Sequence, residues 1–316
     1  DVQSLAASLD IWEVRPDEGY IVALVTLEER QALQAQGYDV AVDEALTASL
    51  SAVSGYPCYR TMDELYADLE RLAVDHADVV QVYTIGYGFE GRPLVVARLT
   101  NRAIPGDKPV LFVTGGIHGR ELITVEVVTA FAERLAERYG LDPDVTWILD
   151  HHEVHLLVSA NPDGHARNET SAAYWRKNTH PYGVCTYYGV DLNRNHTYKW
   201  NACDGCSSGD PCAWSYRGPA PGSEPETRAI EAYTRALFAD RRGPEGGDPA
   251  PLTTSGAFLT LHAYGNEVMW PWGWTSAPPP NVDGLAAFAR KLSRYNGYSA
   301  IPSWQLYFTD GTSDDW

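Results

Sequence analysis

Alternating strand and helix patterns run through most of the chain, and they restrict its fold more than any other feature. MDELYADLERLAVDH is typical of an amphipathic helix, and VVQVYTIG and PLVVARLT are typical of strands around a turn. The buried strand PVLFVTG leads directly into a predicted helix over residues 120–138. Further core strands are predicted in VHLLVSA and AFLTLHA, and further helices over Glu226–Phe238 and Val282–Tyr295. Strands separated by crossover helices predict an α/β domain, whose ligands bind at the C-terminal strand ends.

The first 50 residues differ from the rest, with ten acidic and two basic side chains. Their patterns predict strands around Ile11–Val14 and Tyr20–Val25, a helix over Leu27–Gln36, a strand over Tyr38–Val42 and then the linker ALTASLSAVSG. We therefore expect a small acidic α+β segment, residues 1–50, followed by an α/β domain, residues 51–316.

The charge balance restricts the partners of the chain. With 24 basic and 42 acidic residues its net charge is -18, which disfavours binding to nucleic acid or to anionic membranes and suits cationic substrates. No apolar stretch approaches the ~18 residues of a membrane span, and the N-terminus has no signal-peptide pattern. We expect a soluble chain that starts after any targeting peptide.

The stretch GGIHGRE, residues 115–121, places His118 and Glu121 at the end of the predicted strand PVLFVTG. Their three-residue spacing puts both side chains on one side of a first helical turn. Imidazole and carboxylate are common zinc ligands, and a catalytic zinc needs a third. From spacing alone, the alternative is a polar helix N-terminus in which Glu121 complements the helix dipole.

His262 is the candidate third ligand, because it follows the apolar run AFLTL and a second strand would bring it to the same sheet edge. A hydrogen-bonded core histidine is the alternative. HHEVH, residues 151–155, lacks the HExxH spacing, and we interpret it as a solvated strand entry. Arg92, Arg176 and Arg194 are a second clue, since guanidinium groups bind substrate carboxylates and stabilise oxyanions.

Eight motifs carry a family resemblance. In chain order, EGRPL, GGIHGRE, NPDG, YWRKN, GVDLNRN, YRGPAPGSEPET, LTLHAYG and LYFTDGTSDDW resemble the zinc carboxypeptidases of the carboxypeptidase A/B type. The resemblance covers residues 59–316 and is far more specific than any single motif. It implies a three-layer α/β/α domain with a mixed, twisted eight-stranded sheet. It also implies a secreted, extracellular protein similar to the bacterial members, with one zinc ion.

The resemblance also implies roles for individual residues at the metal. His118, Glu121 and His262 would bind the zinc ion. Asp191 would orient the imidazole of His118, as carboxylates commonly do for zinc histidines. Arg176 would polarise the scissile carbonyl and stabilise the oxyanion.

Substrate binding is implied for a second set of residues. Asn193 and Arg194 would clamp the free C-terminal carboxylate, Tyr307 would close over the terminal residue, and Arg92 would be an auxiliary arginine. A bidentate carboxylate anchor admits only chain ends, so the implied substrates are peptide and protein C-termini.

Asp314 occupies the position that faces the base of the specificity pocket in this family. A partly buried carboxylate there would pair with a substrate Lys or Arg, and we expect basic or mixed basic and hydrophobic preference. The alternative is a solvated loop acid.

The resemblance places the catalytic general base, a glutamate, on a strand shortly after the Asp-Trp pair. Because the chain ends at Trp316, we expect that residue beyond it, and no Glu of this chain takes the role by motif. A catalytically silent zinc-binding module is one alternative, and a cell-wall peptide peptidase of the same family is another. Residues 1–50 resemble, more weakly, the end of an activation pro-segment that inhibits its own enzyme.

The five cysteines favour disulfides in an oxidising compartment over a structural zinc site. Cys185 resembles the family's disulfide cysteine, and its partner among Cys203, Cys206 and Cys212 stays open. The odd count leaves one thiol, with Cys58 far from the others.

Overall fold

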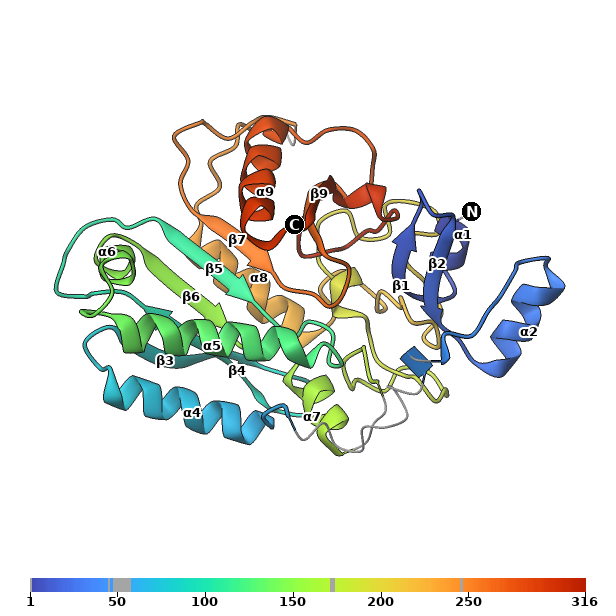
Figure 1. Ribbon diagram of the computed structural model, residues 1–316, viewed down its shortest axis with the longest axis horizontal. Helices are drawn as coiled ribbons and strands as arrows, with labels where there is room; N and C mark the ends of the chain where they lie inside the picture. The colour runs from blue at the N-terminus through green and yellow to red at the C-terminus, as the bar shows by residue number, and fades with distance from the viewer. Residues whose placement is uncertain (1, 45, 48–57, 171–173, 245–246) are drawn as a thin grey trace.

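A computed structural model describes residues 2–44, 46–47, 58–170, 174–244 and 247–316. A twisted sheet lies between helices on both faces, and the N-terminal segment packs beside it (Figure 1). Helices α4 (Met62–Asp75) and α5 (Leu122–Arg138) cover one face, and α8 (Pro225–Leu237) covers the other. The predicted α/β class is therefore confirmed.

The main sheet has five strands in the order β3-β4-β6-β5-β7. These are β3 (Val80–Tyr87), β4 (Pro93–Leu99), β6 (Glu153–Leu157), β5 (Val110–Thr114) and β7 (Ala257–Thr260). The sheet is mixed: β3, β4 and β6 pair antiparallel, whereas β5 is parallel to β6 and β7. All five strands were predicted within a few residues.

The eight-stranded sheet implied by the resemblance is wrong for the described residues. Two later strands, β8 (Glu267–Trp270) and β9 (Ser299–Pro302), pair with each other in a separate sheet. The chain between β8 and α9 (Val282–Asn296) runs through PWGWTSAPPP, whose four prolines lack the N–H groups that a ladder requires.

Alternation along β4 builds the core on both faces of the sheet. Val95 and Leu99 pack with Leu65 and Leu69 of α4, whose N-terminus is closed by a capping box between Thr61 and Glu64. Leu94 and Val96 point to the other face and pack with Ile230 of α8. The sheet is thus a rigid platform whose C-terminal edge can position a site.

Several short elements complete the domain. They are α6 (Pro143–His151), α7 (Pro162–Thr170), and the 3-10 turns η1 (Leu192–Arg194) and η2 (Ser303–Gln305). The interpretation of HHEVH as a solvated strand entry is wrong at His155, which is 2% exposed in β6. Its Nδ1 lies 2.6 Å from the hydroxyl of Tyr233 and its Nε2 lies 3.2 Å from Glu153, so it is a paired core histidine.

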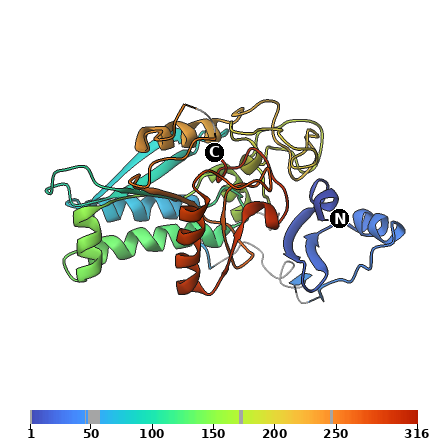
Figure 2. The same cartoon turned by 90° about the horizontal axis from the view of Figure 1, so that it is seen from above.

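The N-terminal segment contains α1 (Val2–Ala6), the antiparallel pair β1 (Asp10–Arg15) and β2 (Tyr20–Leu24), and α2 (Leu27–Ala35). The view in Figure 2 places it at one end of the α/β domain. The predicted strand over Tyr38–Val42 is wrong, because those residues are mostly exposed and belong to no ladder. Apart from Leu46 and Thr47, the predicted linker lies outside the described residues.

Two disulfides are present among the described residues, which confirms the preference for disulfides over a zinc site. Cys185 bonds to Cys212 and Cys203 bonds to Cys206, whereas Cys58 is free and exposed. The first bridge identifies Cys212 as the partner that the sequence left open. No helix in the described part of the chain has the length and apolarity needed to cross a bilayer.

Candidate metal centre and carboxylate site

The site begins where two neighbouring parallel strands end. Thr114 of β5 pairs with Thr260 of β7, and the chain continues from these strands to His118 and His262. The loop after β5 packs too closely for a side chain at Gly119, where a Cβ would lie 2.4 Å from the carbonyl carbon of Gly164. This contact packs the loop that carries His118 against α7 (Pro162–Thr170).

Three side chains converge there. Nδ1 of His118 lies 2.8 Å from one oxygen of Glu121, and Nδ1 of His262 lies 3.2 Å from the other. One ligand atom from each residue lies within 4.8 Å of the others. His118 and Glu121 are buried, whereas the side chain of His262 is 27% exposed, so the cluster opens on the side of His262.

The cluster fits a zinc ion. Oε2 of Glu121 is buried, and its 3.2 Å contact with Nδ1 of His262 does not meet hydrogen-bond geometry, so a cation between the two atoms would stabilise this oxygen. Two imidazoles and a carboxylate form a common catalytic zinc set. Cys203, Cys206 and Asp310 also lie close enough for a metal, but their sulfurs are joined in a disulfide and offer no thiolate.

Asp191 connects the cluster to an arginine. Its Oδ1 lies 3.2 Å from Nε2 of His118, and its Oδ2 accepts hydrogen bonds from Nε and Nη2 of Arg176 at 3.1 and 2.9 Å. Burial raises the pKa of Asp191, but Arg176 and His118 outweigh it and hold that pKa well below its usual range. The contact leaves Nδ1 of His118 directed at Glu121, the orientation that a metal ligand requires.

Asn193 and Arg194 follow in η1 and are both buried. Nε of Arg194 is buried without a hydrogen-bond partner, although its Nη1 donates to the carbonyl of Asn193. Oδ1 of Asn193 accepts from the backbone N–H and the hydroxyl of Ser313, which turns the amide NH2 group the other way. These donors form a cationic site for an anion.

A small cavity joins these groups. Arg176, Asp191 and Arg194 line it together with Tyr307, Trp214 and residues of the N-terminal segment. Eight of the predicted site residues therefore lie in one region: His118, Glu121, His262, Asp191, Arg176, Asn193, Arg194 and Tyr307.

Two predicted residues lie in other surroundings. Arg92 donates hydrogen bonds to Glu90 and to the buried carboxylate of Asp163, and no contact between it and the cluster is present among the described residues. Asp314 is half-buried and accepts a hydrogen bond of 2.8 Å from the hydroxyl of Ser303. Their functional roles stay predictions.

The sequence did not point to Asp10 or Arg120. Asp10 of β1 is 3% exposed and pairs through both carboxylate oxygens with the guanidinium of Arg120, which stands between His118 and Glu121 in the chain. Burial raises the pKa of Asp10, but the charge of Arg120 outweighs it and lowers that pKa. Arg120 is part of the motif GGIHGRE, but Asp10 lies 110 positions away in the sequence, so no local pattern connects the two residues.

A family model described as zinc carboxypeptidase matches residues 65–316. This chain belongs to the zinc carboxypeptidase family. It is 32% identical to mouse carboxypeptidase A2 over 270 residues, which cover 83% of this chain and 60% of that protein. It is 29% identical to mouse carboxypeptidase A1 over 331 residues, covering all of this chain and 71% of that protein.

Solved structures of zinc carboxypeptidases share the fold. The crystal structure of carboxypeptidase A from Helicoverpa armigera superposes with a TM-score of 0.78 at 24% identity, covering 98% of this chain and 78% of that one. The N-terminal segment is included in this match. The chain spans 60% of the length of mouse carboxypeptidase A2.

Proposed function

We propose that this chain carries the zinc centre and substrate-binding groups of a metallocarboxypeptidase that removes C-terminal residues from peptides and proteins. The observation that carries the proposal is the connected series His262, Glu121, His118, Asp191 and Arg176. It joins a metal-ligand set to an arginine whose side chain is 10% exposed. Family membership supports the same reaction class.

His118, Glu121 and His262 would hold the zinc ion. When bound, zinc supplies Lewis-acid polarisation of a carbonyl and activates water at neutral pH. Arg176, fixed by two hydrogen bonds to Asp191, would stabilise negative charge developing on the scissile carbonyl oxygen.

Arg194 and Asn193 would bind the free carboxylate of the substrate. The unpartnered Nε of Arg194 and the amide NH2 of Asn193 are available donors, because Ser313 occupies the amide oxygen. An anion is the ligand that such a buried cationic group requires, and every peptide supplies one at its C-terminus whatever its side chains are. Tyr307 lines the same cavity and would cover the terminal residue.

Asp314 would select basic terminal residues. Ser303 donates to only one of its two carboxylate oxygens among the described contacts, which leaves an acceptor for an ammonium or guanidinium group. The net charge of -18 favours approach of cationic peptides.

Residues 1–50 would act as a pro-segment of the enzyme. Asp10 binds Arg120 between the two zinc-ligand positions, and Leu9 and Ile11 line the cavity beside Arg176. Asp10 lines the same cavity as Arg176 and Arg194, so a segment held there would block the cavity to an incoming peptide. Two disulfides suit a secreted, extracellular protein.

The test is zinc analysis combined with hydrolysis of N-acylated dipeptides ending in Lys, Arg or Phe, each as a free acid and as a C-terminal amide. Turnover is measured on the zinc-loaded protein. We expect one zinc per chain and release from the free acids but not from the amides. Bound zinc without any release would favour a silent zinc-binding module.

A further inference from the structure

The segment that carries Tyr307 is fixed at Asp310, three residues further along. Asp310 is fully buried although it bears a carboxylate. Because three extended residues span at most ~10 Å, the place of Asp310 limits where the ring of Tyr307 can lie. The next residue is fixed as well, since the backbone N–H of His196 donates to the carbonyl of Gly311 at 2.9 Å.

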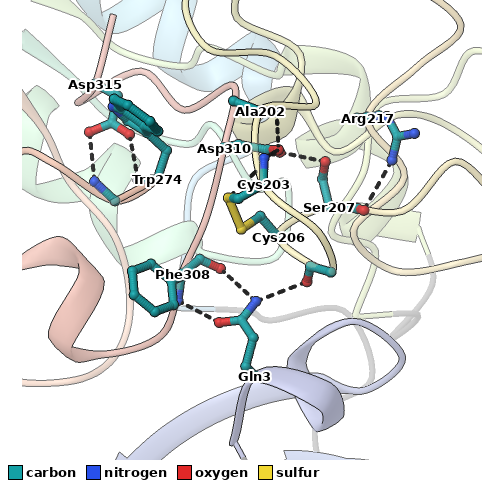
Figure 3. The surroundings of a disulfide bond; sticks show 12 residues. Gln3, Ala202, Cys203, Cys206, Ser207, Arg217, Trp274, Phe308, Asp310 and Asp315 are labelled. Carbon is teal, nitrogen blue, oxygen red and sulfur yellow. Dashed lines mark hydrogen bonds between the residues drawn. A yellow bond between two sulfur atoms is a disulfide. The ribbon is translucent and has the colours of Figure 1, made fainter. Parts of the chain in front are cut away.

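Three donors hold the Asp310 carboxylate, and all come from one short loop. The backbone N–H groups of Ala202 and Cys203 donate to Oδ2 at 2.7 and 3.2 Å, and the hydroxyl of Ser207 donates to Oδ1 (Figure 3). A buried carboxylate is stable only when its oxygens are met in this way.

The Cys203–Cys206 disulfide closes that loop between the donors. Ala202 and Cys203 stand on one side of the bridge and Ser207 stands directly after it. The bridge therefore fixes the spacing of the donors that meet the two carboxylate oxygens. Cys185–Cys212 lies in the same region of the chain, but the donors to Asp310 are not on its residues.

The N-terminal segment binds the same two elements. The side-chain amide of Gln3 donates to the carbonyls of Gly205 and Phe308 at 2.9 and 3.2 Å, and its oxygen accepts from the N–H of Phe308 at 2.7 Å (Figure 3). One side chain thus spans the disulfide loop and the residue after Tyr307, so these two elements present a single surface.

We propose that the Cys203–Cys206 loop and Asp310 form a clamp that positions Tyr307 in the carboxylate-binding cavity. Asp310 is a positioning residue, because it acts through the chain that leads to Tyr307. The inference rests on the proposed function only for the consequence that substrate binding weakens when the clamp is lost. The clamp itself is a property of the folded chain.

Hydrogen exchange in the full chain tests the clamp without substrate. The probes are the amides of Phe308 and Thr309, which donate to Gln3 and to the carbonyl of Gly273. In the variant Cys203→Ser/Cys206→Ser we expect these amides to exchange roughly tenfold faster, since a weakened set of charged hydrogen bonds favours local opening. The matched control Cys185→Ser/Cys212→Ser removes the other bridge and leaves them unchanged.

Single variants at Ser207 keep both disulfides and give a second test. Ser207→Ala removes one donor to Asp310 and should accelerate exchange of the two amides. Ser207→Thr retains the hydroxyl, so its exchange rate should equal that of the parent protein. In protein with turnover, Ser207→Ala should raise KM for free-acid substrates severalfold with kcat retained, because a binding group has lost its position.

Exchange at Phe308 and Thr309 that is unchanged in the Cys203/Cys206 variant, or equally fast in the Cys185/Cys212 control, would overturn the clamp. Absence of turnover in every variant and in the parent protein counts against the proposed function alone, since exchange is measured without substrate.

Discussion

Asp10→Asn tests whether the N-terminal segment is held by its carboxylate. The side chains of Asp10 and Arg120 are 2% and 8% exposed, so the substitution leaves a buried guanidinium without its charge partner. Breaking a buried ion pair costs about 3–5 kcal/mol. Asparagine keeps one acceptor oxygen, and we therefore expect the bound position of the segment to lose about 3 kcal/mol of stability. This loss corresponds to an increase on the order of 100-fold in the population of molecules whose segment is displaced.

The assay is calorimetric titration of the zinc-loaded chain with an N-acylated lysine that carries a free carboxylate. Only the form with a displaced segment has the cavity accessible, so the apparent Kd should fall by up to roughly 100-fold in Asp10→Asn. The control Asp17→Asn makes the same charge change at an exposed position of the same segment. Equal affinities in the two variants would refute the assignment of Asp10 as the anchor.

Three further predictions follow from single side chains. Burial, together with Glu224 and Asp163, raises the pKa of Glu226 to about 7. The protonated side chain therefore stabilises the folded protein fully below about pH 4.5, and this stabilisation is lost as the pH rises to about 7. Glu226→Gln should remove this pH dependence, roughly 3 kcal/mol of unfolding free energy, as measured by thermal unfolding at different pH values. Asp314→Asn should lower kcat/KM at least tenfold (about 1.4 kcal/mol) for C-terminal Arg but not for Phe, and equal losses would contradict a specificity role. His118→Ala should abolish the rise in Tm that excess zinc gives the parent protein, and an unchanged rise would place the metal elsewhere.

Local sequence patterns predicted the part of the site that depends on strand ends. The apolar strand before GGIHGRE and the run before His262 became β5 and β7, which are adjacent and parallel, so their ends meet. Periodicity and glycine placement were sufficient here, because both ligand positions follow directly from the strands that carry them.

Other features were beyond such patterns, because they depend on which distant segments meet. The Asp10–Arg120 pair joins a separate small unit to the sheet edge, and the partner of Cys185 was decided by the path of a loop. His155 was expected at the surface, but β6 is a central strand of a sheet covered by helices on both faces, and His155 contacts Tyr233 of α8. The strand expected over 38–42 had local propensity but found no neighbour to pair with.

Anomalous diffraction at the zinc absorption edge tests the central claim most directly. Crystals of the full chain grown with one equivalent of zinc should show one strong peak bounded by Nδ1 of His118, the carboxylate of Glu121 and Nδ1 of His262, at ligand distances of about 2.0–2.2 Å. A peak at Cys203, Cys206 and Asp310, or no peak at the histidines, would contradict the account.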